Sequence, residues 1–181
     1  GDVPDGIGGA DNDSLGARAT AERSIAIGGD ALALGIGATV VGNNATATQR
    51  GATAIGLSAD ATGVEATAIG QFALASAEDA TAIGERAQAT AERSVAIGSA
   101  SQATANSSIA VGFASDATAE GAVAVGRFTT AIAVNATALG RGSDAFGRAD
   151  IALGANASTQ NTTSQTVGNI AIGSSRKSVS G

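Results

Sequence analysis

The pentapeptide Ser94-Val95-Ala96-Ile97-Gly98 decides the fold, because close copies of it recur along the chain with glycine in a fixed register. Self-similarity at a fixed period is the signature of a repeat protein, in which each unit packs mainly on its two neighbours. We therefore expect a solenoid. Ten glycines mark the period, standing fourteen residues apart at Gly28, Gly42, Gly56, Gly70, Gly84, Gly98, Gly112, Gly126, Gly140 and Gly154.

Each repeat contains two segments with the alternation of a β-strand. Counted from the glycine as zero, position −1 is Ile, Val or Leu, position −3 is Ile, Val or Thr, and position −2 is Ala in every copy except Val40. After the glycine, position +5 is Ala in nine of ten copies, whereas positions +4 and +6 carry many Asp, Gln and Thr residues. Side chains of two kinds thus alternate with a period of two. Charged residues gather at −6, −5, +1 and +2, which predicts two corners per repeat.

The pattern predicts an all-β fold, a parallel β-roll whose fourteen-residue coils each hold two strands of about five residues and two short turns. Stacked at about 4.8 Å per coil, ten coils make a rod about 48 Å long. Helices are rejected, because each repeated glycine would cost a helix about 1 kcal/mol relative to alanine. At a tight corner the same glycine would supply positive φ or close backbone approach.

The alternation predicts the first strand but does not by itself fix which face points inward, since both of its faces are apolar or small. We expect the large residues at −3 and −1 to fill the roll and the small residues at −2 to form a flat outer strip, suited to the close approach of another subunit. A merely exposed alanine ladder, or the inverted facing, stays open at this point. The expected core residues are Ile25, Ile27, Ile55, Ile69, Ile83, Val95, Ile97, Ile109, Val111, Val123, Val125, Leu139, Ile151 and Leu153. The candidate trimer interface is Ala26, Ala54, Ala68, Ala82, Ala96, Ala110, Ala124, Ala138 and Ala152.

The register divides the chain into four parts. Residues 1–23 form an irregular N-terminal cap, and residues 24–154 form the regular roll. Gly173 follows Gly154 by nineteen residues instead of fourteen, so residues 155–173 are expected to form a coil with an inserted loop. Residues 174–181 are a tail or a junction to a downstream segment.

Composition excludes several classes of function. The chain has no Cys and no His, which removes disulfides, zinc–thiolate sites and the usual general base, and its net charge is −6. We therefore expect no enzyme, no cofactor, no metal and no nucleic-acid partner. We expect neither a signal peptide nor a membrane helix within this segment, because no run of apolar residues is long enough.

Candidate ligand-contact residues are spread along the chain, and the sequence does not choose among them. They are the Asp, Thr and Gln of the second strand, the corner Arg residues and the loop at 155–167. Phe72, Phe113 and Phe128 occupy corners, where they are expected to be partly exposed as partner anchors, lids over the edge of the roll or contacts between chains. The sequons at Asn44, Asn135 and Asn161 are expected by chance in such a composition, so no modification is assigned.

The repeat resembles the head repeat of trimeric autotransporter adhesins, the YadA-like family of Gram-negative outer-membrane proteins. The matching residues are the Ser-Val-Ala-Ile-Gly type pentapeptides from 24 to 154, with a further copy at 169–173. The resemblance implies a left-handed parallel β-roll, a homotrimeric head and attachment to host cells or to matrix proteins such as collagen, fibronectin or laminin. It also implies a bacterial cell-surface location, anchored in the outer membrane by segments outside this sequence. Most coils lack the Asn-Ser that many family copies carry, although Asn106-Ser107-Ser108 keeps it.

An alternative solenoid function stays open beside the adhesin, either an ice-binding rod or a polysaccharide-acting β-helix. The first would need an unbroken threonine ladder, whereas position +6 is interrupted, for example by Leu34 and Phe146. The second would need clustered acids and exposed aromatic residues in a groove. Neither pattern is seen in the sequence.

Overall fold

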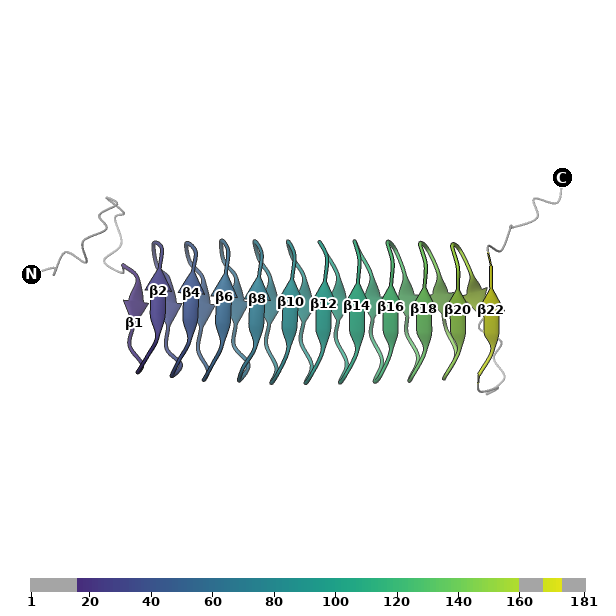
Figure 1. Ribbon diagram of the computed structural model, residues 1–181, viewed down its shortest axis with the longest axis horizontal. Helices are drawn as coiled ribbons and strands as arrows, with labels where there is room; N and C mark the ends of the chain where they lie inside the picture. The colour runs from purple at the N-terminus through teal and green to yellow at the C-terminus, as the bar shows by residue number, and fades with distance from the viewer. Residues whose placement is uncertain (1–15, 160–167, 174–181) are drawn as a thin grey trace, which may run out of the picture.

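The chain forms a straight rod of stacked coils, as seen in the computed structural model, which describes residues 16–159 and 168–173. All twenty-two elements in these residues are short strands, and the chain advances from β1 at one end of the rod to β22 at the other (Figure 1). The residues that the structure describes contain no helix long and apolar enough to cross a membrane. The predicted all-β parallel solenoid is confirmed.

The strands form two parallel sheets of eleven strands each, and every coil contributes one strand to each sheet. The odd-strand sheet consists of β1 (Arg18–Ala19), β3 (Leu32–Ala33), β5 (Thr46–Ala47), β7 (Asp60–Ala61), β9 (Leu74–Ala75), β11 (Gln88–Ala89), β13 (Gln102–Ala103), β15 (Asp116–Ala117), β17 (Thr130–Ala131), β19 (Asp144–Ala145) and β21 (Ser158–Thr159). The even-strand sheet consists of β2 (Ile25–Ile27), β4 (Thr39–Val41), β6 (Thr53–Ile55), β8 (Thr67–Ile69), β10 (Thr81–Ile83), β12 (Val95–Ile97), β14 (Ile109–Val111), β16 (Val123–Val125), β18 (Thr137–Leu139), β20 (Ile151–Leu153) and β22 (Ile170–Ile172).

Residues fourteen apart are paired between neighbouring coils, as Ala96 pairs with Ala110. The register of β1 is the same, since Arg18 pairs with Leu32, so regular pairing begins before the residue 24 at which it was expected. Between β20 and β22 the offset is nineteen, because Ile151 pairs with Ile170. The even-strand sheet therefore continues past the insertion without a break.

Two four-residue turns close each coil, and they leave less room for strand than expected. In the coil after Gly98, the N–H of Ser101 donates to the carbonyl of Gly98 at 3.3 Å, and the N–H of Ser108 donates to the carbonyl of Ala105 at 3.1 Å. The third residue of each turn, Ala100 and Ser107, has a positive φ of 57° and 56°. The turns thus reduce the predicted five-residue strands to two and three residues.

The repeated glycine is required at its corner for two reasons. Gly84 has a φ of 133°, a conformation that residues with a side chain rarely adopt. A Cβ added to Gly84 would lie 2.5 Å from the carbonyl oxygen of Gly98 in the next coil, so the coils can stack only without it. Both reasons predicted for the glycine period are therefore confirmed.

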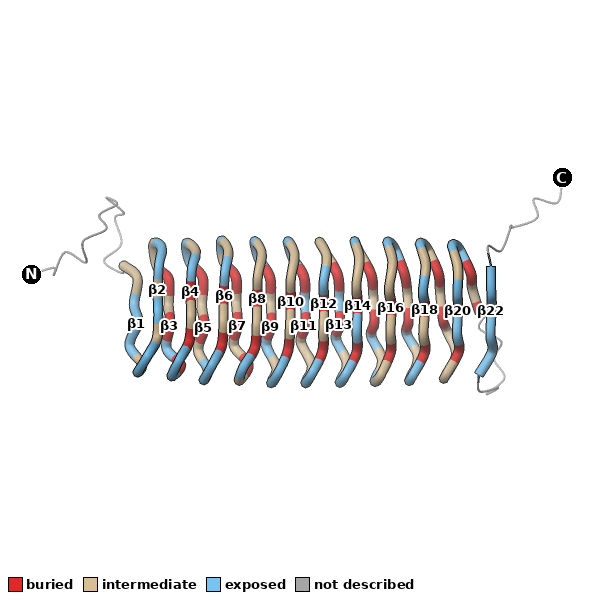
Figure 2. Tube along the Cα trace, in the orientation of Figure 1, coloured by how far each residue is buried: buried red, intermediate tan, exposed pale blue. Residues whose placement is uncertain are grey.

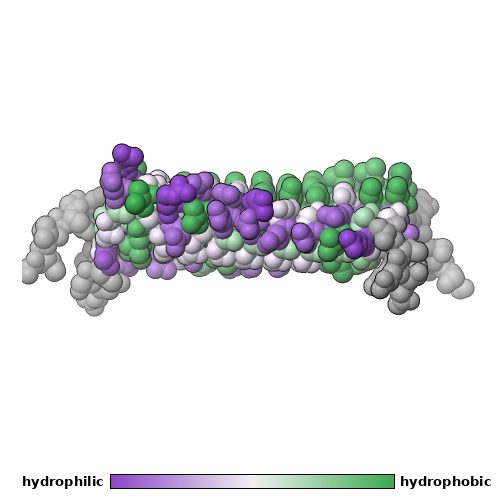
Figure 3. All heavy atoms as spheres, turned by 90° about the horizontal axis from the view of Figure 1, so that it is seen from below, coloured by the Kyte–Doolittle hydropathy of each residue, from purple (hydrophilic) through white to green (hydrophobic). Residues whose placement is uncertain are grey.

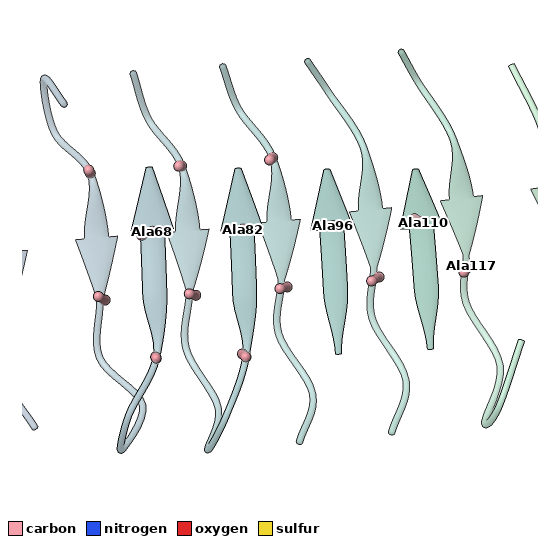
Figure 4. Packing of buried hydrophobic residues seen from close by; sticks show 14 of the residues in the cluster. Ala68, Ala82, Ala96, Ala110 and Ala117 are labelled. Carbon is pink, nitrogen blue, oxygen red and sulfur yellow. The ribbon is translucent and has the colours of Figure 1, made fainter. Parts of the chain in front are cut away.

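The expected facing of the even strands is wrong, because alanine fills the roll and the large residues lie outside it. Figure 2 shows buried positions recurring in coil after coil along the rod. Ala96 and Ala103, from the two sheets, are both 0% exposed. The sheets lie so close that only the four small side chains at −4, −2, +3 and +5 fit between them in each coil. Figure 4 shows this packing, with Ala68, Ala82, Ala96 and Ala110 on successive even strands and Ala117 on an odd one.

The correction applies to both sets of predicted residues. Of the supposed core, Ile25, Ile27, Ile55, Ile97, Ile109, Leu139, Ile151 and Leu153 are exposed, and Ile69, Ile83, Val95, Val111, Val123 and Val125 are half-buried. Of the supposed interface, Ala54, Ala68, Ala82, Ala96, Ala110, Ala124, Ala138 and Ala152 are fully buried and Ala26 is packed against them. These alanines cannot reach another subunit.

Hydroxyl groups enter the core where they can bond to a turn. Ser101 and Thr129, at position +3, each donate a hydrogen bond of 2.8 Å to the carbonyl of the glycine three residues earlier. Their oxygen atoms are thus paired although the residues are fully buried. Serine and threonine therefore replace alanine at this position without an unpaired polar group.

Candidate binding surfaces

The outer face of the even-strand sheet has a continuous aliphatic row at −1 beside Ile, Val or Thr at −3, and we call this face the aliphatic ridge. It consists of the side chains at −3 and −1 of each coil, and its −1 row is aliphatic in all eleven strands. Figure 3 shows hydrophobic atoms along this margin of the rod. An apolar patch running the whole length of a rod marks an interaction surface. The −1 row is Ile27, Val41, Ile55, Ile69, Ile83, Ile97, Val111, Val125, Leu139, Leu153 and Ile172.

The outer face of the odd-strand sheet is mostly polar, as predicted. Its +4 row stacks Gln88 on Gln102 and Asp116 on Thr130 in register. Burial raises the pKa of the Asp60 and Asp116 carboxyls above their ordinary value, because partial loss of water disfavours the charged form. The Oδ1 atom of Asp60 is buried and has no hydrogen-bond partner among the described residues. The exposed side chains of Gln88 and Gln102 suit this face to hydrogen bonding with a ligand.

The two edges of the rod differ in character. We call the edge formed by positions +1 and +2 the glycine corner and the edge formed by positions −6 and −5 the charged corner. On the charged corner Arg50 pairs with Glu65 at 2.7 Å and Arg93 with Glu92 at 2.9 Å. These side chains are largely exposed, so such pairs contribute about 1 kcal/mol at most to stability.

The glycine corner carries the aromatic residues. Phe72, Phe113 and Phe128 are 44%, 46% and 48% exposed, which confirms the expected partial exposure. Phe113 and Phe128 meet edge to face, with ring centroids 5.3 Å apart and an interplanar angle of 79°. The guanidinium of Arg127 lies 4.5 Å from the centroid of Phe128 and 5.6 Å from that of Phe113.

The arginine contacts were not predicted, although the period contains the signal. Positions fourteen apart lie side by side, so the guanidinium of Arg86 is brought to 5.4 Å from the ring centroid of Phe72 one coil earlier. In the same way Arg127 occupies the place of Phe113 in the following coil. Cation–π contacts of this kind contribute about 0.5–1 kcal/mol at exposed sites.

The insertion is fastened by a buried carboxylate. Asp150 is 0% exposed at position −4, where the nine preceding coils have Ala or Ser. Its Oδ2 accepts a hydrogen bond from the N–H of Gly147 at 3.0 Å, and its Oδ1 accepts one from the N–H of Asn169 at 2.7 Å. The carboxylate thus anchors the chain where it re-enters the sheet. Of the proposed ligand-contact loop at 155–167, residues 160–167 lie outside the described part of the chain.

The remaining candidate sites are the glycosylation sequons, a surface hollow and groups of acidic residues. Asn44 and Asn135 are exposed at corners with positive φ, which asparagine tolerates better than most residues; Asn161 lies outside the described residues. An open hollow of about 320 Å³ lies at the β1 end, lined by Gly16, Arg18, Asp30, Ala31, Leu32, Asn44 and Thr46. In residues 16–159 and 168–173, no three or more Asp and Glu residues are grouped as metal ligands would be.

Comparison with known proteins agrees with this architecture. A family model described as the YadA head domain repeat (2 copies) matches residues 16–31, 33–59 and 61–87 and five overlapping stretches from 75 to 157. A search among curated proteins gives no match. The crystal structure of the collagen-binding domain of the Yersinia adhesin YadA is similar, with a TM-score of 0.54 and 28% identity, over 78% of this chain and 69% of that one. The chain therefore belongs to the family of YadA head domain repeats and is an adhesin-like head domain.

Proposed function

We propose that this chain is the non-enzymatic head of a bacterial surface adhesin, which attaches as a homotrimer to host cells or extracellular matrix proteins. The family supports the role, and one observation carries the assembly: the uninterrupted aliphatic row at position −1. A monomer would leave this row in water along the whole rod, at an unfavourable free energy for each side chain. Burying it against other copies removes that cost.

The trimer places the aliphatic ridge of each copy toward the other two. This differs from the arrangement expected from sequence, in which the alanines at −2 formed the contact, because those alanines fill the roll. Side chains of Ile, Val and Leu interlock across such an interface as they do in a domain core. In the whole protein, outer-membrane anchoring would come from segments outside this sequence.

The ligand surface is then the polar outer face of the odd-strand sheet, which stays in water when the ridges are covered. Its Gln, Thr and Asp side chains recur in most coils and in each copy, so weak contacts add through multivalency. Collagen is the first ligand to test, since the similar Yersinia domain is a collagen-binding domain. Fibronectin and laminin are the other matrix proteins that the proposal covers.

Assembly is tested by light scattering after gel filtration across a dilution series. A mass of about three times 17.1 kDa is expected. A well-folded species of 17.1 kDa at every concentration would overturn the trimer.

Binding is tested on immobilised collagen, fibronectin and laminin. The double variant Gln88→Ala/Gln102→Ala, on the polar face, should weaken binding about tenfold, because each trimer loses the contact three times. Glu78→Ala/Asp79→Ala, on the charged corner, is the matched control and should bind like the native chain. If the native chain and both variants bind equally well, the ligand site lies on another surface. If the native chain binds none of the three matrix proteins, this ligand class is overturned.

A further inference from the structure

This inference rests on the trimer proposed above, whose repeated contacts specify only weakly how the three copies are aligned along the rod. Neighbouring coils are nearly alike, so sliding one copy along another by one coil, about 4.8 Å, would preserve most ridge-to-ridge contacts. Strands of uniform pattern specify register weakly for the same reason. A feature of the chain that is not repeated must therefore fix the axial register of the three copies.

Within the regular coils, the largest departure from repetition on the two corners is the group of Phe113, Arg127 and Phe128 on the glycine corner. Three large side chains project there from two successive coils and hold one another through the edge-to-face ring contact and the stacked guanidinium. Both rings remain nearly half exposed in the single chain. The group is a preorganised projection, and no other part of the described corners carries two rings in contact.

At the same height along the rod, the −1 row of the ridge has Val in two successive coils. Among the eleven strands, the −1 position is Val only at Val41, Val111 and Val125. The last two belong to the coils that carry the aromatic group. β16 is also the one described even strand with Val at both outward positions, since it contains Val123 and Val125. Because Val is shorter than Ile or Leu, these two successive Val residues at −1 leave room for a phenyl ring from another copy.

The glycine corner is also the edge better suited to lie against a neighbour. Over the ten regular coils, five of its twenty residues are charged, compared with ten of twenty on the charged corner. A threefold assembly joins two different patches of neighbouring copies, so each copy can offer an edge on one side and its ridge on the other. Desolvating the less charged edge costs less free energy.

We propose that the Phe113–Arg127–Phe128 group of one copy packs on the valine section of the ridge of the next copy, at the same height, and that this contact sets the axial register of the trimer. The occupant of this aromatic corner is thus a second copy of the same chain. A contact made only at one height penalises a slip that the repeated coils would tolerate.

Cysteine cross-linking reads the register directly, since the chain contains no cysteine of its own. Ile69→Cys chains and Ile83→Cys chains, whose substituted residues lie one coil apart on the ridge, are mixed, unfolded and refolded, and then oxidised. Level copies give same-position disulfides (69–69 and 83–83), whereas copies slipped by one coil give 69–83 disulfides between chains, identified by mass spectrometry. A disulfide tolerates a Cα separation of about 4.4–6.8 Å, so a slip of one coil changes which pairs can form.

The expected result is that same-position disulfides predominate about tenfold in the native background, as for a register gap of about 1.4 kcal/mol. Phe113→Ala/Phe128→Ala should remove that preference, while Phe146→Ala, which removes the fourth phenylalanine away from this corner, should keep it. Retention of the preference in the double variant, with trimer mass intact, would overturn the register proposal and leave the trimer standing. A monomeric mass for the native chain would overturn both.

A second variant tests the fit between the rings and the valine section. Val125→Ile adds one methylene to the exposed ridge, where more apolar surface should strengthen a simple ridge-to-ridge contact. If phenyl rings fill this section, the same change should instead weaken assembly. The protein concentration at which half of the trimer has dissociated, the midpoint of a dilution series, should then rise about threefold. A lower midpoint would contradict the proposal, and far-UV circular dichroism shows whether each variant retains the β-roll.

Discussion

The two sheets share one interior but present opposite exteriors. Inward, Ala96 of the even-strand sheet and Ala103 of the odd-strand sheet are equally and fully buried. Outward, Ile97 lies on the aliphatic ridge, and Gln102 lies on the polar face. The inner positions are therefore set by the distance between the sheets, whereas the outer positions can be adapted to a partner.

The largest effect should come from the inner face, where the two sheets are alike. Ala96→Ile places three extra carbon atoms in a layer that holds only small side chains, and we expect a loss of about 3 kcal/mol in the free energy of unfolding. Urea denaturation at fixed protein concentration measures it. Ala103→Ile should cost about the same, and unchanged stability in either variant would show that the interior is not close-packed.

The second-largest effect should be on trimer assembly, and it should distinguish the outer faces of the two sheets. Ile97→Asp places a charge on the ridge of each copy, and we expect the dissociation constant of the trimer to rise at least about a hundredfold while the single roll stays folded. Sedimentation equilibrium measures it. Gln88→Asp, on the polar face, is the matched control; equal loss of assembly in both variants would place an interface on the odd-strand sheet as well.

A smaller loss of stability is expected near β22, where the even-strand sheet extends beyond β21, the last described strand of the odd-strand sheet. Asp150→Ala leaves the N–H groups of Gly147 and Asn169 without their carboxylate acceptor, and we expect a cost of about 1 kcal/mol in the free energy of unfolding. Hydrogen exchange at Ile170–Ile172 should accelerate most. Ser143→Ala removes a hydroxyl donor whose acceptor, the carbonyl of Gly140, also accepts the N–H of Ser143, so it should cost less. Unchanged exchange in Asp150→Ala would show that β22 is held by its strand pairing alone.

The smallest effect concerns the pH dependence of the polar face. Because burial raises the pKa of Asp60 and Asp116, the folded chain holds these protons more tightly than the unfolded chain. This contribution to stability is present at acidic pH and is lost as pH rises from the ordinary carboxyl range through the raised pKa. Asp60→Asn/Asp116→Asn should raise the melting temperature by about 1–3 °C at pH 7 and change it less near pH 3. A melting temperature lowered at pH 7 would contradict this sign.

The coil itself could be predicted from the sequence, because its causes are local and repeated ten times. Glycine at every fourteenth residue, alternation on both sides of it and charges at the corners give the parallel roll. The facing of the even strands could not be predicted by ranking side chains by hydrophobicity. Position −2 is almost always Ala, whereas −3 varies between Ile, Val and Thr, and this greater uniformity is what a tightly limited interior produces.

The aromatic group was predicted only in part. Exposure of Phe113 and Phe128 follows from their corner positions, which the sequence gives. Their contact with each other and with Arg127 depends on side-chain rotamers and on the exact stacking of two corners. Likewise, the nineteen-residue step indicates an insertion, but only the structure shows that Asp150 binds the N–H on its far side.

Hydrogen bonds between coils run along the rod, as in the 2.9 Å bond from the N–H of Val95 to the carbonyl of Ser108. A pulling force along the same axis would therefore load the terminal coil first and peel it from the stack, since the ladders act one after another and do not share the load in parallel. A strand sheared along its length breaks many bonds at once, but here each strand lies across the pull. Mechanical resistance of such a head would consequently depend on how its end coils are fastened and on lateral contact between copies, and lengthening the rod would extend its reach without strengthening it.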